Sequence, residues 1–168
     1  GSAIIEMRRD GGFNVYTGSV EIGQGTKTTL KIIALESLKI FNEDKVFIIT
    51  GDTFLTPDSG TTTASGATYR SGRAIKMASE KLIKILKKEV SEIFNVPENN
   101  ITLKDEIFYD KNGNEIVNYE KLGEILYEKR RLPKVEAHFN FPTSKTKIFG
   151  AFGLPHHIFS FSGSIALV

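Results

Sequence analysis

Two short stretches of small and polar residues are the best candidates for binding chemistry in this chain. The first runs from Glu21 to Thr26 with the sequence EIGQGT, and the second runs from Thr61 to Thr68 with the sequence TTTASGAT. Each stands where a helix is expected to begin, and a helix start offers unpaired backbone N–H groups and a partial positive charge. Glycine removes the Cβ that would keep a ligand away from that backbone. Two such stretches in one small chain suggest a bound anionic or multi-acceptor cofactor.

Both stretches also have a simpler interpretation, and the residues alone leave the alternatives open. The glycines around Gln24 could form a tight turn that points this side chain into solvent. Alternatively, the amide of Gln24, which both donates and accepts, could bind the edge of a heterocycle. The motif differs from the dinucleotide fingerprint G-x-G-x-x-G, because Thr28 stands where the third glycine would be. The second stretch is either a loop with a helix cap or a row of hydroxyl and N–H groups around a phosphate or pterin.

The other polar residues favour structural roles. Asp52 follows a predicted strand and is expected to anchor loop backbone rather than act as a base or a metal ligand. Asp58 is expected in a turn, and Glu21 is expected to pin the turn that follows it. His156 and His157 are adjacent, so their side chains would diverge in a strand, which is poor geometry for one metal ion. No catalytic or metal-ligating set is predicted from these residues.

Apolar periodicity predicts the elements that position the two stretches. Strands are expected over 3–8 and 13–17, with a hairpin turn at Asp10-Gly11-Gly12 between them. A helix is expected from Thr26 to Phe41, closed by Asn42, and a short buried strand over 46–49. A long amphipathic helix that begins near Ser65 or near Ser71 runs to Phe94.

The second half of the chain has shorter predicted elements. A helix is expected over Tyr119 to Glu128, among several strand-like segments: 101–103, 107–109, 116–117, 135–139 and 159–168. This order predicts an α/β (α+β) fold, with a two-layer mixed β-sheet and helices packed on one face.

The composition is that of an ordinary globular chain. Apolar residues make up 40% of the 168 residues, charged residues make up 25%, and the net charge is +2, so no broad attraction to nucleic acid or membrane is implied. The chain has no cysteine, which excludes an iron–sulfur cluster held by this chain alone. No stretch reaches the roughly 18 apolar residues of a membrane helix. We expect a cytoplasmic protein and, because both ends are strand-like, a piece of a longer polypeptide.

Together these residues resemble the molybdenum-hydroxylase family, which includes xanthine dehydrogenase and aldehyde oxidase. The resemblance is to the molybdopterin-binding region of the large subunit and covers almost the whole chain. It depends on several short motifs in the same order and spacing: Asp10-Gly11, Glu21 to Thr26, Gly51 to Thr53, Pro57, Gly60-Thr61, Ala64-Ser65, Gly72 and Gly153 to His156.

The resemblance implies a set of residues that bind molybdopterin, the molybdenum cofactor: Gly23, Gln24, Gly25, Ala64, Ser65, Gly66 and Ala67. In this set Gln24 would hydrogen-bond the pterin, Ala64 and Ser65 would lie beside it, and Gly66 and Ala67 would contribute backbone contacts. It implies no catalytic residue and no metal ligand here, because the family's catalytic glutamate lies elsewhere in the large subunit.

The resemblance also implies a reaction and partners. Enzymes of this family hydroxylate purines, aldehydes or related heterocycles with oxygen taken from water. Iron–sulfur clusters and FAD would be carried only by other domains or subunits. The expected partners are the remaining domains of the large subunit, the iron–sulfur and flavin subunits and a small-molecule substrate, with no nucleic acid and no membrane. The chain alone is expected to be inactive, and residues 96–131 are expected to be a variable insertion within a single domain, 1–168.

Two alternatives from other classes remain at this stage. One is a stand-alone module that binds a nucleotide or phosphate through the same glycines and threonines. The other is a non-catalytic interaction domain, in which both stretches only connect elements.

Overall fold

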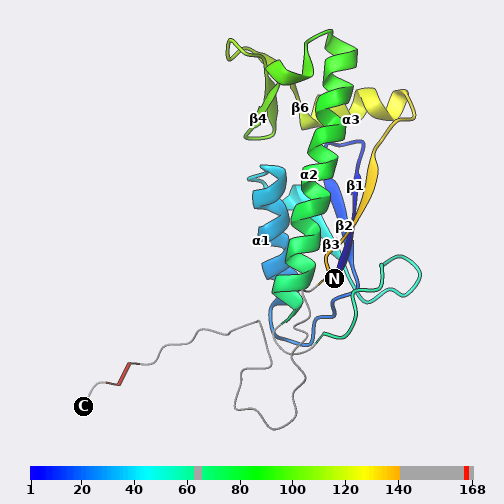
Figure 1. Cartoon of the computed structure of the whole chain (residues 1–168), viewed down its shortest axis with the longest axis vertical. Coiled ribbons are helices and arrows are strands. Elements are labelled where there is room, and N and C mark those ends of the chain that lie inside the picture. The colour runs from blue at the N-terminus through cyan, green and yellow to red at the C-terminus, as the bar shows by residue number, and fades with distance from the viewer. Residues whose placement is uncertain (63–65, 141–164, 167–168) are drawn as a thin grey trace.

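The computed structural model describes residues 1–62, 66–140 and 165–166. It has the mixed α/β architecture that the sequence predicts, with two sheets and three α-helices among the described residues (Figure 1). The pair His156-His157 and the predicted strand over 159–168, except for residues 165–166, lie outside the described residues, and 165–166 carry no strand.

The larger sheet has four strands in the order β3-β2-β1-β7. Its strands are β1 (Ser2–Met7), β2 (Phe13–Thr17), β3 (Val46–Ile49) and β7 (Lys134–His138). β1 pairs antiparallel with both β2 and β7, and β2 pairs parallel with β3. The parallel pair requires a crossover, which is supplied by the helix between β2 and β3. The mixed sheet and the hairpin at Asp10-Gly11-Gly12 are therefore confirmed.

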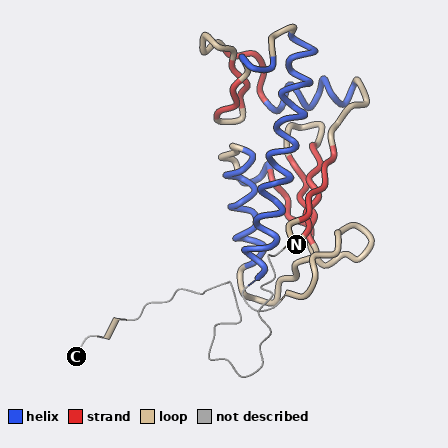
Figure 2. Tube along the Cα trace, in the orientation of Figure 1, coloured by secondary structure: helices blue, strands red, loops and turns tan. Residues whose placement is uncertain are grey.

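Two long helices, α1 (Thr26–Leu38) and α2 (Gly66–Phe94), cover one face of this sheet (Figure 2). They form the second layer, and their apolar stripes meet the strands in one continuous core. The core residues contributed by the helices are fully buried: Leu30, Ala34, Leu38, Ala74, Ile75, Ala78, Leu82, Leu86 and Val90. Because these residues face the core, their apolar spacing follows the helical period, which is why the spacing predicts the two helices.

Helix α2 is continuous through both of its glycines, beginning at Gly66 and not at Ser71. Gly72 lies where α2 crosses α1, and a Cβ added there would come within 2.7 Å of Cδ1 of Ile33. The absence of a side chain at Gly72 thus lets the two helices approach closely, which compensates for its poor helix propensity.

A smaller unit is inserted between α2 and β7. It contains a 3₁₀ segment, a short α-helix and a second sheet with the order β4-β5-β6: η2 (Glu98–Asn100), β4 (Thr102–Lys104), β5 (Ile107–Tyr109), β6 (Glu115–Asn118) and α3 (Tyr119–Glu128). Its apolar residues belong to the same core as the larger sheet. The predicted elements between residues 101 and 139 are confirmed to within about two residues.

Tyr119 joins this unit to the main sheet. Its ring packs edge-on against Phe13 of β2 and Phe108 of β5, with centroid distances of 5.1 and 5.7 Å. Its hydroxyl donates a 2.9 Å hydrogen bond to the carbonyl of Leu38 at the end of α1. Burial raises the pKa of Tyr119, so the hydroxyl stays protonated as a donor.

Three details differ from the sequence-based expectation. Helix α1 ends at Leu38 and not at Phe41, because Lys39 adopts a left-handed conformation with φ of 60°. Phe41 is consequently outside the helix and 80% exposed. Among the strands of the described residues, β3 (preceded by the 3₁₀ segment η1, Glu43–Lys45) lies at the edge of its sheet and not in a buried position, and Phe47 on it is 53% exposed. A short apolar run cannot distinguish these two positions in a sheet.

Candidate functional site

The two candidate stretches lie at the same end of the molecule. Helices α1 and α2 run in the same direction, so their first turns are at one end, together with the carboxyl ends of β2 and β3 (Figure 1). The loop 18–25, which leads into α1, and the loop 50–62, which leads toward α2, therefore gather there. Loops at the carboxyl ends of parallel strands are a common place for ligands in α/β proteins.

Serine and threonine hydroxyls tie these loops together. The Oγ atoms of Ser19 and Ser71 are hydrogen-bonded at 2.7 Å, and both residues are buried. The amide of Val20 donates to Oγ1 of Thr62 at 3.3 Å, and the amide of Gly18 donates to Oγ of Ser59 at 3.0 Å. The loop that carries Gly23-Gln24-Gly25 is thus held against the loop and helix start that carry the second stretch.

Gln24 stabilises its own loop. Its Nε2 donates to the carbonyl of Val20 at 2.9 Å and to Oγ1 of Thr26 at 2.8 Å, and its Oε1 accepts from the amide of Ile22 at 2.7 Å. Both amide hydrogens are therefore used within the loop, and one lone pair of Oε1 remains. This arrangement is neither a side chain pointing freely into solvent nor one whose donors are available to a heterocycle.

Gly23 and Gly25 have the left-handed backbone that favours glycine, with φ of 100° and 79°. A Cβ added at either position would find no described atom within 4 Å, and both residues are exposed. The backbone at these two positions is accordingly open to a flat partner from outside the chain.

Glu21 pins the turn, as the sequence predicts. Its Oε1 accepts from the amides of Gly23 and Gly25 at 2.8 and 3.0 Å, and its Oε2 accepts from the amide of Lys27 at 2.9 Å. The residue that precedes α1 is Gly25, which has no side chain to cap the helix, and Glu21 supplies that cap instead. These backbone donors, that of Lys27 most of all, hold the pKa of Glu21 below its ordinary value.

The second stretch is described only in part. Ala64 and Ser65 lie outside the described residues. Gly66 is buried at the first position of α2, and Ala67 follows it, half-buried. Arg70 lies across this helix start: a Cβ added at Gly66 would come within 2.8 Å of its Nε. The start of α2 therefore carries a guanidinium, whereas the start of α1 carries a carboxylate.

The remaining loop 50–62 is ordered by its own side chains. Oδ1 of Asp52 accepts from the amides of Phe54 and Leu55 at 2.9 and 3.0 Å, which confirms the prediction that this residue anchors backbone. Asp58 accepts from the amide of Gly60 at 2.8 Å, in agreement with its predicted turn role.

Sequence reasoning missed the buried serines. Oγ of Ser59 contacts the backbone of Ser2 and Gly18 and the hydroxyl of Thr17, so it connects β1, β2 and the loop. Ser19 and Ser71 pair across 52 residues of chain. Only their burial distinguishes these serines from solvent-exposed ones, and a single sequence does not reveal burial at isolated polar positions.

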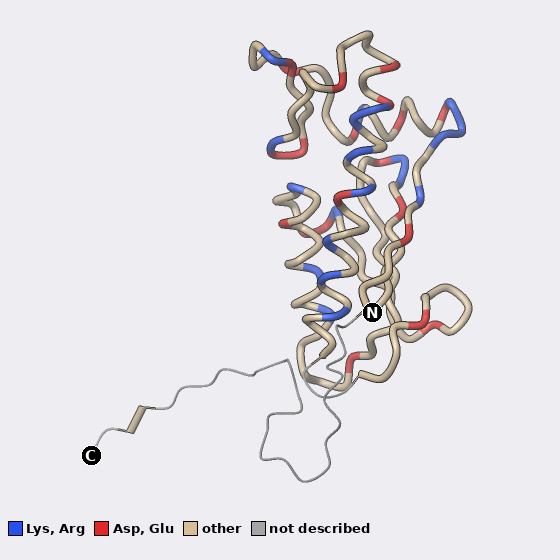
Figure 3. Tube along the Cα trace, viewed as in Figure 1, with Lys and Arg blue, Asp and Glu red and all other residues tan. Residues whose placement is uncertain are grey.

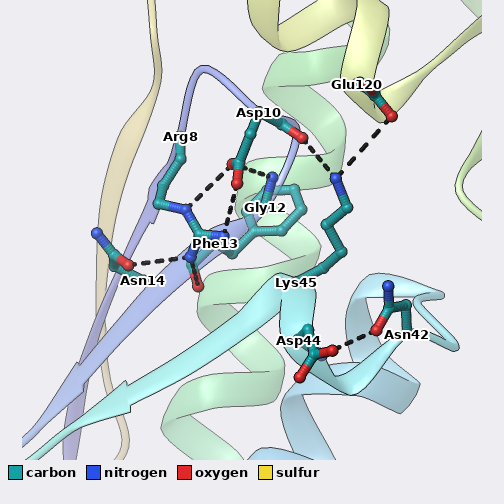
Figure 4. A network of polar contacts seen from close by, with 9 residues as sticks. All are labelled: Arg8, Asp10, Gly12, Phe13, Asn14, Asn42, Asp44, Lys45 and Glu120. Carbon is teal, nitrogen blue, oxygen red and sulfur yellow. Dashed lines mark hydrogen bonds and ion pairs between the residues drawn. The ribbon is translucent and has the colours of Figure 1, made fainter.

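A second polar network lies at the opposite end of the sheet (Figure 4). Asp10 accepts two hydrogen bonds from Arg8, at 3.1 and 3.0 Å, and one from the amide of Gly12 at 2.9 Å. Lys45 donates to the carbonyl of Asp10 at 2.9 Å and lies 4.0 Å from the carboxylate of Glu120. The hydrogen bonds from Arg8 lower the pKa of Asp10. This network fixes the β1–β2 turn against α3, and we assign it a structural role.

Acidic and basic residues are interspersed along the described part of the chain, and many of the Lys and Arg residues belong to the two long helices (Figure 3). Within residues 1–62, 66–140 and 165–166, no group of three or more His, Asp or Glu is placed to hold a metal ion. Among the helices of the described part of the chain, none combines the length and apolarity needed to cross a membrane.

The fold and the two glycine-rich helix starts at one end define an α/β domain of the cofactor-binding kind. The family model described as the molybdopterin cofactor-binding domain matches residues 1–168. The chain belongs to this family, and molybdopterin is the cofactor of its class.

Two curated relatives are similar in sequence. The chain is 29% identical over 161 residues to a probable xanthine dehydrogenase subunit of Bacillus subtilis (strain 168), a match that covers 95% of this chain and 20% of that protein. It is 30% identical over 99 residues to the gamma subunit of the 6-hydroxypseudooxynicotine dehydrogenase complex of Paenarthrobacter nicotinovorans, a match that covers 59% of this chain and 12% of that one. Both relatives are named as subunits of dehydrogenases, and this chain spans a fifth of their length or less.

A solved structure supports the fold. The CO dehydrogenase of Oligotropha carboxidovorans superposes with a TM-score of 0.77 and 21% identity, over 84% of this chain and 18% of that one. The α/β arrangement described above is therefore shared with a part of that enzyme.

Two features at the start of α1 decide which part of a pterin cofactor these residues suit: the exposed glycine backbone and the amides bonded to Glu21. The open backbone at Gly23 and Gly25 suits the approach of a flat heterocycle. Glu21 already accepts hydrogen bonds from three amides at the start of α1, those of Gly23, Gly25 and Lys27, so these three are not available to an anion. This arrangement at α1 suits an uncharged part of the cofactor better than its phosphate.

Proposed function

We propose that this chain forms one wall of the molybdopterin pocket in an oxidoreductase of the xanthine dehydrogenase and aldehyde oxidase type. The observation that supports this most is that the starts of α1 and α2 lie at one end, where the hydrogen bond between Ser19 and Ser71 holds the α1 loop against α2. We infer that a single ligand at that end contacts both loops. The family match indicates that this ligand is molybdopterin.

We propose a different contribution to cofactor binding for each group of residues. Gly23 and Gly25 leave their own positions in the α1 loop without side chains, so that the pterin can approach the backbone there. Gln24 holds this loop in shape through its three internal hydrogen bonds and presents the remaining lone pair of Oε1. We further propose that Ala64 and Ser65 belong to the same binding site and that Gly66 and Ala67 contribute backbone contacts to the pterin.

The bound cofactor would supply the molybdenum centre at which a substrate is hydroxylated with oxygen from water. We propose purines, aldehydes or related heterocycles as the substrate class. The names of the relatives refer to xanthine, 6-hydroxypseudooxynicotine and CO, so proteins with this domain act on different substrates. We infer that substrate choice is made outside this domain and that the domain alone is inactive.

The proposed partners complete the enzyme. The relatives are named as subunits of larger enzymes, which supports assembly with other domains and subunits. We propose that those parts carry the iron–sulfur clusters and FAD, and that the enzyme is cytoplasmic. We further propose that residues 96–131, which form the smaller unit, are a variable scaffold within one domain.

The nucleotide-binding alternative loses support at α1. A phosphate at this helix start would have to displace the carboxylate of Glu21 from the amides of Gly23, Gly25 and Lys27, or bind beside its negative charge. Calorimetry of the 168-residue chain with ATP and with GTP is expected to show no saturable heat. Tight binding of either nucleotide would favour the alternative.

The substitution Gln24→Ala in the complete subunit tests the proposed function. It removes three hydrogen bonds from the loop, and we expect the molybdenum content per subunit to fall on the order of tenfold. The measurement is metal analysis of the purified enzyme. The control is Asn112→Ala, in the exposed turn between β5 and β6, which is expected to leave the molybdenum content unchanged. Equal molybdenum content in the two variants would contradict the proposed role of Gln24.

A further inference from the structure

Glu21 has an arrangement that the cofactor-binding role does not require by itself. Its carboxylate accepts hydrogen bonds from the backbone amides of Gly23, Gly25 and Lys27, with N···O distances between 2.8 and 3.0 Å. Two of these amides precede α1, and the third belongs to its second residue. A cluster of backbone donors at a helix start is the kind of place where proteins bind an external phosphate or carboxylate. Here the chain fills the place with its own anion.

The filled cluster has two physical consequences. The carboxylate links both glycines to the first turn of α1, so the loop is held in its observed shape before any guest arrives. The negative charge of Glu21 also offsets the partial positive charge of the helix start, so a second anion there would meet repulsion and would find no free donor among the three amides.

The neighbouring bonds reinforce this preformed state. Gln24 bonds the backbone of Val20 and Ile22, on either side of Glu21, and the hydroxyl of Thr26. Thr29 closes the first turn by donating from its amide to the carbonyl of Gly25 at 3.0 Å. The loop therefore needs no ligand to satisfy these groups.

We propose that Glu21 is a positioning and specificity-determining residue that acts as a built-in anion at the start of α1. Glu21 holds the loop in a shape that suits the uncharged pterin face of the cofactor. Its negative charge excludes the phosphate-bearing part of the cofactor from this helix start. The inference rests on the proposed function, because it fixes which part of a pterin cofactor faces α1. The phosphate of that cofactor then lies away from the α1 loop.

Amide hydrogen exchange of the 168-residue chain tests the positioning role without cofactor. In Glu21→Ala, exchange at the amides of Gly23, Gly25 and Lys27 is expected to become about three- to tenfold faster than in the unsubstituted chain, because each loses its acceptor. Glu21→Gln, with one acceptor oxygen in place of two, is expected to give intermediate rates and provides a milder variant if Glu21→Ala fails to fold. The control is Glu36→Ala, which removes the same charge near the other end of α1 and is expected to leave these three rates unchanged.

Titration with inorganic phosphate, followed at the same three amides by NMR, tests the exclusion. The unsubstituted chain is expected to show no saturable shift, whereas Glu21→Ala is expected to show one. Unchanged exchange in Glu21→Ala, a saturable phosphate shift in the unsubstituted chain, or no phosphate shift in Glu21→Ala would each overturn the proposal. The proposed function is judged separately by molybdenum content, so the two can fail independently.

Discussion

The residues that shape the candidate site are those whose side chains bond the backbone of their own loop. Within the segment 20–27, Glu21 and Gln24 together accept hydrogen bonds from four backbone amides, and Gln24 donates one to a backbone carbonyl. A loop that satisfies its own polar groups keeps its form in water, so little ordering entropy remains to be lost when a guest binds. Preorganisation, rather than free hydrogen-bonding groups, is thus the main contribution that we assign to these two side chains.

The ionisation of Glu21 gives a pH dependence at this scale. Its folded-state pKa is lowered by backbone donors, so its contribution to the loop is present above its unfolded pKa of about 4.3 and is lost as the pH falls through the lower folded-state value. The amide shifts of Gly23, Gly25 and Lys27 should therefore titrate together with a midpoint below about 4.3. The same amides in Glu21→Ala should show no such titration. A midpoint at or above the ordinary value would contradict the assigned role of this carboxylate.

At the scale of elements, the site depends on how the β2–α1–β3 crossover and α2 are aligned. The parallel pairing of β2 and β3 places the starts of both the α1 loop and the loop toward α2 at one end. The Gly72 contact with Ile33 then lets α2 lie close to α1. Changes that disturb this helix pair should act on the site even where they touch no ligand.

Most of the elements could be predicted because their apolar residues follow helical or strand spacing over several turns or pairs. The position of β3 at the sheet edge could not be predicted, because the apolar run from Val46 to Ile49 is equally typical of a buried strand. The end of α1 depends on one left-handed residue, Lys39, which has no sequence signature. The link between Ser19 and Ser71 depends on tertiary contacts across 52 residues, so local pattern carried no sign of it.

Tyr119 offers a test of how the smaller unit is joined to the sheet. Tyr119→Phe keeps the ring contacts with Phe13 and Phe108 but removes the buried hydrogen bond to the carbonyl of Leu38. We expect the free energy of unfolding to fall by about 1–3 kcal/mol in urea denaturation, because that carbonyl loses its donor.

A matched control for this substitution is Tyr127→Phe. Tyr127 is 51% exposed, and its ring, which lies under the guanidinium of Arg9, is retained in the variant. Its effect should stay within about 0.5 kcal/mol. Equal losses of stability in the two variants would show that the Tyr119 hydroxyl makes no special contribution.

At the scale of the whole molecule, we propose that one end of the domain binds the cofactor and that the other has a structural role. The two loops and helix starts gather at the first end, whereas the Arg8, Asp10 and Lys45 network closes the second (Figures 1 and 4). The chain spans a fifth or less of the curated relatives that it matches, and we propose that other parts of such an enzyme supply the rest of the pocket. This division explains why we expect cofactor binding here and substrate choice elsewhere.

The most direct test is a crystal structure of the complete subunit with molybdopterin bound. We predict that the pterin lies against the backbone of Gly23 to Gly25 and also contacts Gly66 or Ala67, with Glu21 still bonded to its three amides. A pterin that touches only one of the two loops, or that lies at the end of the sheet near Asp10, would contradict the proposed pocket.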